Sequence, residues 1–340
     1  MKPFLQRVLR LLVASSIFSA SAFAADQIVF EGKSGPGLGK HIVFLAGDEE
    51  YRSEESLPML AQLLAVRHGF KCTVLFPINP ADGTIDPTTL NNIPGIEALD
   101  SADLCVMALR FRELPDPQMK HFVDYLNRGG AIIALRTSTH AFSYEQNKQS
   151  PYAKFDWRNK EWPGGFGQQV LGETWVDHHG NHGKESTRAI VNAPFKDHPI
   201  LRGVTNVWVP TDVYTVTHLP SDATVLMWGA VLTGMNPEDK PLEGSKNTPM
   251  MPVVWVRNYP GEQNHVSRIV TTTMGSAVDF QNEGLRRLLV NAAYWCTGLS
   301  DKIDGNADVT YVGEYKPLWF GFGKFAKGIK PDDIVRKSGP

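Results

Sequence analysis

The residues most suited to chemistry stand in "ETWVDHHGNHGKES", residues 173–186. Three histidines within five positions are flanked there by three acidic residues: His178, His179, His182, Glu173, Asp177 and Glu185. Imidazoles titrate near neutral pH and also bind metals, so the cluster fits a metal site or an acid/base or sugar-binding site, while a polar surface loop is the simpler alternative. Residues that fold onto the same place from elsewhere in the chain decide between these interpretations.

A zinc ion would require side chains that converge at about 2.0–2.1 Å from the metal. The pattern H-H-x-x-H is not a common zinc motif, and adjacent residues of an extended chain point apart, so two of the histidines converge more easily than three. His140 or a carboxylate from residues 48–50 would then complete the ligand set. The sequence requires no cofactor, but it leaves open a divalent metal such as zinc on His178, His179 and His182.

The segment "GDEEYR", residues 47–52, follows a predicted strand. Two carboxylates in different environments can divide into a general acid and a general base, so Glu49 and Glu50 are candidates for catalysis. Asp48 and Arg52 are candidates for substrate binding. The alternative is a solvated acidic loop that leads into a helix capped by Ser53.

The segment "RTSTH", residues 136–140, follows another predicted strand. Arg136 offers a planar fork that suits a carboxylate or vicinal hydroxyl groups, although a salt bridge to Glu49 or Glu50 would also explain it. His140 is a candidate proton carrier. The hydroxyl groups of this segment, including that of Ser138, would bind substrate or cap the next helix.

The first half of the chain predicts an α/β fold. Strands are predicted at residues 41–46, 72–76, 104–109 and 131–136, and helices begin at Ser53 and Asp116. Continuous apolar strands that alternate with helices are typical of a flavodoxin-like parallel sheet with helices on both faces. Ligands in such folds bind beyond the carboxyl ends of the strands, where segments 47–52 and 136–140 lie.

The second half is less regular. Residues 143–185 form a long insertion rich in aromatic residues. Such rings pack against sugars and bind their hydroxyl groups, although a small satellite core beneath a long loop is the alternative. Further strands are predicted at 224–230, 252–256 and 267–273, followed by a helix at 282–298.

The chain begins with a segment typical of a signal peptide. Residues 1–24 carry three basic residues, a short apolar run and a final Ala-Phe-Ala. We therefore expect an exported protein, periplasmic or secreted, with no membrane span in the mature chain. Residues 25–39 are predicted to be an extended lead-in, residues 40–298 the α/β domain, and residues 299–340 a tail that wraps the domain or contacts a partner.

Composition and net charge restrict the classes of partner that we expect. The net charge of −2 offers no basic face for nucleic acid. The three cysteines, Cys72, Cys105 and Cys296, all have apolar neighbours, so we expect buried, unpaired thiols.

Several segments together resemble the ThuA-like family, named for trehalose utilisation. They are "GGAIIALRTSTHAF" (129–142), "VLGETWVDHH" (170–179), "HPILRGVTNVWVPTDVYTV" (198–216), and "MPVVWVRNYPG" with "SRIVTTTMGS" (251–276) before the helix "LVNAAYWCTGL". The resemblance covers roughly residues 40–298 and depends on the order and spacing of these segments.

The resemblance implies a fold like that of class I glutamine amidotransferases and a role in sugar catabolism. His178 matches a family histidine, while Arg136 stands where the family usually has one. Asp212 and Tyr214 stand in the family's D-E-L-Y element and, with His182, are candidate substrate-binding residues. Class I amidotransferases carry a nucleophilic cysteine at the turn after strand 131–136, and its absence here argues against glutamine amidotransfer.

We therefore predict that the protein acts on a small carbohydrate or keto-sugar derivative by general acid/base chemistry, as a hydrolase or an isomerase. His140 and His178 or His179 would carry protons, with Glu49 or Glu50 as the partner carboxylate. The alternatives are a non-catalytic sugar-binding protein and an interaction module whose tail docks on a protein partner or on a second copy of the chain.

Overall fold

The computed structural model describes residues 26–338. Its strands are β1 (Gln27–Phe30), β2 (His41–Gly47), β3 (Lys71–Leu75), β4 (Leu104–Leu109), β5 (Ala131–Leu135), β6 (Thr187–Val191), β7 (Trp208–Val209), β8 (Thr224–Val231), β9 (Met251–Pro260) and β10 (Val266–Thr272). Its α-helices are α1 (Ser53–His68), α2 (Asp116–Asn127), α3 (Glu283–Cys296) and α4 (Pro331–Ser338). The predicted strands and helices of both halves are present, with ends shifted by a few residues.

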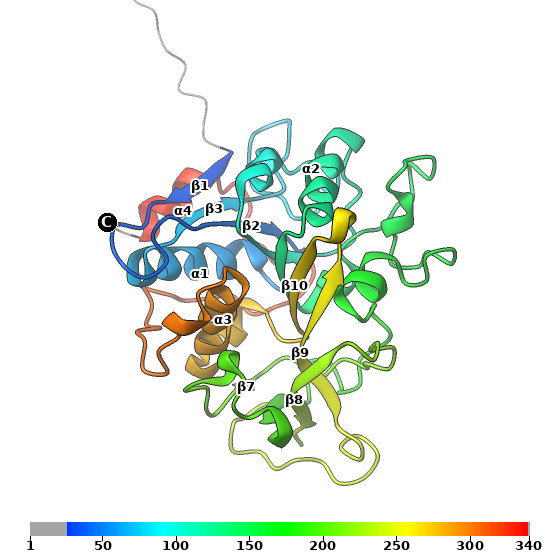
Figure 1. Ribbon diagram of the computed structural model, residues 1–340, viewed down its shortest axis with the longest axis vertical. Coiled ribbons are helices and arrows are strands. Elements are labelled where there is room, and N and C mark those ends of the chain that lie inside the picture. The colour runs from blue at the N-terminus through cyan, green and yellow to red at the C-terminus, as the bar shows by residue number, and fades with distance from the viewer. Residues whose placement is uncertain (1–25, 339–340) are drawn as a thin grey trace, which may run out of the picture.

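All of these strands form one sheet in the order β1-β3-β2-β4-β5-β10-β9-β8-β6-β7 (Figure 1). The pairs from β3 to β10 are parallel. Numbered among themselves, these five strands have the order 2-1-3-4-5 of flavodoxin-like folds, which confirms the predicted fold class. The strand order reverses between β2 and β4, and the ligand crevice of such folds lies at their carboxyl ends.

The second half of the chain extends the parallel core with antiparallel strands. From β10 the sheet continues through β9, β8, β6 and β7, each pair antiparallel. The sequence predicted several of these strands but not their direction, because an apolar run does not specify its partner.

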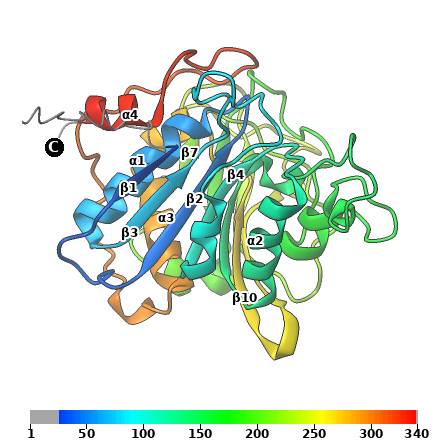
Figure 2. The same ribbon diagram turned by 90° about the horizontal axis from the view of Figure 1, so that it is seen from above.

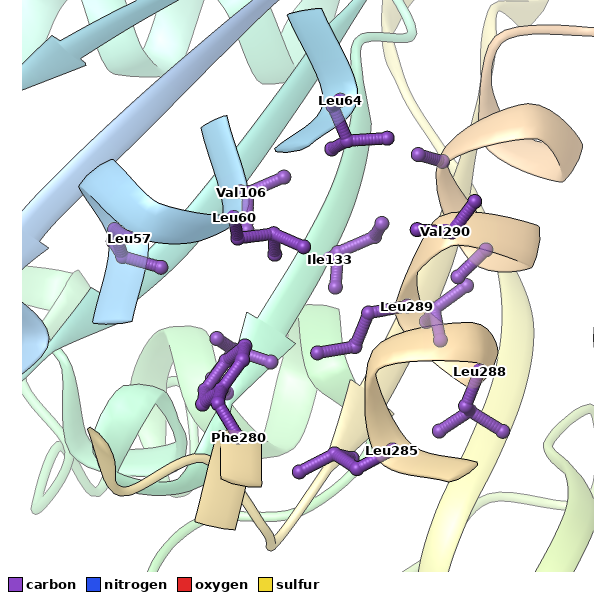
Figure 3. Packing of buried hydrophobic residues seen from close by; sticks show 14 of the residues in the cluster. Leu57, Leu60, Leu64, Val106, Ile133, Phe280, Leu285, Leu288, Leu289 and Val290 are labelled. Carbon is purple, nitrogen blue, oxygen red and sulfur yellow. The ribbon is translucent and has the colours of Figure 1, made fainter. Parts of the chain in front are cut away.

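Helices cover both faces of the parallel core, as predicted (Figure 2). On one face, α1 and α3 pack against the sheet and each other, and Figure 3 shows Leu60 of α1 and Leu289 of α3 beside Ile133 of β5. On the other face, Phe122 of α2 lies in a second cluster with Ile132 of the same strand. Each such buried side chain contributes roughly 1.5–3 kcal/mol.

Of the two predicted boundaries of α1, the end at Gly69 is confirmed and the cap at Ser53 is not. Gly69 ends α1 with φ 83°, a left-handed conformation that glycine adopts without strain. Ser53 does not cap α1, which is a correction. Its Oγ instead accepts hydrogen bonds from the backbone N–H groups of Gly47 and Asp48, so it fixes the turn after β2.

The tail after α3 lies against the domain. Ile303 and Val309 are buried in the main core, and Phe320 is only 4% exposed. In Figure 2 the tail, coloured orange to red, passes over the loops at one edge of the sheet. The three cysteines are buried and unpaired, as expected.

The signal peptide predicted at residues 1–24 lies outside the described residues. Between residues 26 and 338 no helix combines the length and apolarity that a membrane crossing would need.

Candidate active site

Backbone strain gathers at the carboxyl ends of the central strands. Arg52 after β2, Phe111 after β4 and Arg136 after β5 have φ values of 62°, 52° and 39°. Large side chains rarely adopt this left-handed conformation, and such residues often mark functional sites. The carboxyl ends of β2, β4 and β5, where the sequence predicted a ligand site, are therefore the candidate functional region.

Arg136 is the centre of this region and is 2% exposed. Its guanidinium lies between the rings of Tyr51 and Tyr214, at 4.2 and 4.3 Å from their centroids. It donates to Asp212 Oδ1 at 2.8 Å and to the backbone oxygen of Thr273 at 2.8 Å. A buried arginine needs such a partner, because an unpaired charge in the interior is costly.

This geometry corrects two expectations about Arg136. The residue pairs with Asp212 and not with Glu49 or Glu50. Its guanidinium donates four hydrogen bonds to protein oxygens, so it positions Asp212 and has little capacity left to bind a substrate oxygen.

Asp212 holds two imidazoles on one carboxylate. His178 Nδ1 lies 2.6 Å from Oδ2, and His182 Nδ1 lies 2.9 Å from Oδ1. Burial alone would raise the pKa of Asp212, but Arg136 and the hydrogen bonds from the two histidines outweigh it and hold this pKa well below its usual range. Asp212 is therefore a carboxylate near neutral pH, and each Nδ1 donates to it.

This arrangement leaves His178 Nε2 available. Its side chain is 33% exposed, and within residues 26–338 no hydrogen bond engages Nε2. A neutral imidazole that donates through Nδ1 presents a basic lone pair at Nε2. Asp212 and His178 thus form an oriented acid/base pair.

His182 links this pair to the acidic loop. Its Nε2 lies 3.4 Å from Glu50 Oε1. Burial raises the pKa of Glu50. Because Nδ1 donates to Asp212, Nε2 is the ring nitrogen of His182 that faces the carboxylate of Glu50.

The acidic loop is buried and not solvated, which overturns the solvated-loop alternative. Glu49 pairs with Arg110 at 2.7 Å and with the fully buried Arg112 at 3.6 Å. Burial and the neighbouring Asp48 raise the pKa of Glu49, in spite of both arginines. Glu49 is therefore tied to the turn after β4, and Glu50 is the carboxylate of this loop nearest the histidines.

Two other predicted residues, Asp48 and Arg52, serve the scaffold. Asp48 is 1% exposed and accepts hydrogen bonds from the backbone N–H groups of Glu50 and Tyr51. Arg52 is fully buried and donates to the backbone oxygens of Glu49 and Gly321. Their predicted role in substrate binding is corrected accordingly.

Ser138 is also a scaffold residue. Its hydroxyl donates to the backbone oxygen of Met107, accepts from the N–H of Leu109 and is fully buried. It neither caps a helix nor faces a substrate, because residues 136–140 form a short 3-10 turn tied to β4. The hydroxyl of Thr137 donates a hydrogen bond to Asp48 Oδ2 and so connects this turn to the loop after β2.

His140 is brought near the site but lies beneath aromatic rings. It is 3% exposed and contacts Phe111, Trp157 and Trp175, with ring centroids 5.1–6.2 Å away. Burial, together with Arg110, lowers its pKa well below the usual range. His140 is therefore a neutral imidazole near neutral pH.

His179 is not brought into the cluster. Its Nε2 contacts the backbone oxygen of Lys246 at 2.8 Å, on the other side of the chain from His178. The three-histidine metal set is corrected: the ligand atoms that converge belong to His178, His182 and Asp212, and they lie within 4.8 Å of one another. Tyr214 is 3% exposed and packs on His178 and Arg136.

Three site residues were not predicted individually. Trp175 packs edge-on against His178, and Phe320 of the tail lies 5.2 Å from the His182 ring. Arg110 follows β4 as Arg136 follows β5, so the strand-end rule that selected segments 47–52 and 136–140 would also have selected it. Nothing in the sequence pointed from the tail to the histidines.

The fold and the site define an α/β protein with a flavodoxin-like core and a histidine–carboxylate cluster at the strand-order reversal. The chain belongs to the ThuA family, described as trehalose utilisation, which matches residues 52–296. Comparison with curated proteins gives no match.

Solved structures of two ThuA-like proteins resemble this fold. One, from Parabacteroides merdae, is 15% identical, with a TM-score of 0.49, and covers 76% of this chain and 90% of its own. The other, from Bacteroides uniformis, is 16% identical, with a TM-score of 0.47, and covers 78% and 93%.

Proposed function

We propose that this protein performs general acid/base chemistry on a carbohydrate or keto-sugar derivative, by hydrolysis or isomerisation. The observation that carries the proposal is the pair of imidazoles held through Nδ1 on the buried carboxylate of Asp212. A carboxylate behind an imidazole fixes its tautomer and stabilises the imidazolium that forms during proton transfer. The family's description as trehalose utilisation supports a sugar as the substrate.

His178 is the proton carrier in this proposal, because its side chain is partly exposed and no hydrogen bond from residues 26–338 engages its Nε2. Glu50, whose Oε1 lies 3.4 Å from His182 Nε2, is the partner carboxylate. A reacting sugar hydroxyl or a carbon beside a carbonyl would lie against His178 Nε2, with Trp175 as an apolar wall. His140, as a neutral imidazole behind that wall, is a candidate for the second proton carrier.

A nucleophilic mechanism through Ser138 gains no support. Its oxygen is fully buried and engaged by β4 on two sides. Proton transfer, without a covalent intermediate on this serine, is the chemistry that the placed groups favour.

A divalent metal such as zinc is a second candidate at the same cluster. His178, His182 and Asp212 offer three ligand atoms, a number common in catalytic zinc sites. Against this, the guanidinium of Arg136 already pairs with Asp212 and would repel a cation. Non-catalytic sugar binding and docking through the tail remain alternative functions, and export after cleavage near residue 24 remains a proposal.

The experiment is a substrate screen with metal analysis of the same purified protein. Disaccharides and their 3-keto forms are incubated with protein before and after chelation, and products are followed by chromatography. We expect conversion that survives chelation. Conversion lost with a stoichiometric metal would favour the metal site, and binding without conversion would favour the sugar-binding alternative.

A further inference from the structure

A large groove lies beside the site and takes no part in the chemistry described above. It has a volume of about 850 Å³ and lies between the loop at 88–91, the turn at 111–115 and two parts of the insertion, 143–147 and 157–158. Ligand pockets commonly enclose about 300–1,000 Å³. The groove therefore has room for a ligand larger than one sugar ring.

A row of aromatic rings leads from this groove to the histidines. Phe111 and Trp157 line the groove, with ring centroids 5.7 Å apart. Trp157 contacts Trp175 at 6.0 Å, and Trp175 contacts His178 at 5.9 Å. These ring contacts connect the lining of the groove to the proposed proton carrier.

The backbone at Phe111 is strained in order to place its ring here. Phe111 has a φ of 52°, an uncommon conformation for a bulky residue. It is held by a hydrogen bond from its N–H to the backbone oxygen of His140 and by Arg110, which lies 4.7 Å over the ring. Strain that is maintained at a partly exposed aromatic ring indicates a role for that ring.

The charged groups of the groove are already engaged. The carboxylate of Glu113 accepts hydrogen bonds from the backbone N–H groups of residues 145–147. Arg158 pairs with Glu145 and lies 5.0 Å over the Trp157 ring. Uncharged amide side chains, such as those of Asn91 and Gln146, complete the lining. This combination suits an uncharged ligand with many hydroxyl groups.

We propose that the groove binds the second and third sugar rings of a neutral oligosaccharide whose first ring lies at His178. Phe111 and Trp157 would provide the apolar faces for those rings. The inference rests on the proposed function, and it names the substrate class as an oligosaccharide instead of a monosaccharide.

The test measures affinity against chain length by calorimetry. Sugars of one to three rings, from the series that contain maltose, cellobiose and mannobiose, are titrated into the full-length protein. In at least one series we expect affinity to rise with length. Trp157→Ala and Phe111→Ala should each lower the affinity for the longest sugar roughly tenfold and leave the affinity for the monosaccharide unchanged. Trp157→Phe should retain most of the gain.

Phe195→Ala, which removes an exposed ring outside the groove, is the matched control and should bind like the wild type. Affinity that does not depend on length, or that survives both groove variants, would overturn the inference. Turnover by the wild type separates the two proposals. If long sugars bind through Trp157 but are not converted, the proposal for the groove stands and the proposed acid/base function is refuted.

Discussion

At the scale of single residues, the site depends on one buried ion pair. Arg136 and Asp212 are 76 positions apart in the chain and meet at 2.8 Å, with both side chains almost fully buried. Removal of one partner from such a pair typically costs about 3–5 kcal/mol, because the other charge is left in the interior. The pair is therefore part of the fold as well as of the site.

Glu54 gives a pH-dependent prediction. Its carboxylate oxygens are buried without a hydrogen-bond partner among the described residues, and burial raises its pKa to about 8. The folded protein thus holds a proton that the unfolded chain releases above roughly pH 4.5. Stability should fall as pH rises from there through about 8.

Glu54→Gln copies the protonated form and should remove that loss. We expect the variant to match the wild type near pH 5 and to gain a few kcal/mol in free energy of unfolding near pH 9, measured by urea denaturation. Glu283→Gln changes an exposed carboxylate in the first turn of α3 and should show no such gain. Equal stabilities of wild type and Glu54→Gln at both pH values would contradict the assignment.

The sequence predicted the residue types at this site better than their partners. Apolar runs located the strand ends that carry Glu50 and Arg136, and the clustered histidines themselves marked the segment at 173–186. Spacing also predicted that adjacent His178 and His179 would diverge. The pairing of Arg136 with Asp212 was not predicted, because partners that far apart in the chain are chosen by tertiary packing.

At the scale of elements, the tail contributes a wall of the site. Phe320 packs on Tyr51 at 5.5 Å and on His182 at 5.2 Å. The N–H of Gly321 donates to the backbone oxygen of Glu50. The tail follows the matched family segment, which ends at residue 296, so this wall is an addition to the region shared with the family.

Phe320→Ala should lower the free energy of unfolding by about 3 kcal/mol, because it removes a buried ring. It should also weaken sugar binding, because His182 loses one wall. Phe322 lies two residues further along the chain, and its side chain is 60% exposed. Phe322→Ala should therefore change the free energy of unfolding by no more than about 0.5 kcal/mol. Urea denaturation and calorimetry measure both effects, and similar losses from the two variants would argue against a specific wall at Phe320.

The strands and helices of the parallel core followed from hydrophobic pattern, since apolar runs and amphipathic helices are local features. The antiparallel extension and the packing of the tail did not follow, because β6 to β10 could pair in either direction and the tail has no periodic pattern. These parts are fixed by contacts between distant segments.

At the scale of the whole molecule, the site exists only in the complete fold. The loop after β2 supplies Glu50, the turn after β5 supplies Arg136, the insertion supplies the histidines, and the segment after β7 supplies Asp212. The aromatic rings of the groove connect to the cluster through Trp175, and the tail contacts it through Phe320. The histidine–carboxylate cluster therefore lies at the carboxyl ends of the central strands, in contact with the rings of Trp175 and Phe320.

The most direct test of this account is the rate of sugar conversion by His178→Gln and His179→Gln on the substrate that the screen identifies. His178 lies on Asp212, while its neighbour points away. We predict that His178→Gln loses roughly 10²–10⁴-fold in kcat with its fold intact, whereas His179→Gln stays within a few fold of the wild type. A His178→Gln protein that converts the sugar as fast as the wild type would contradict the central claim.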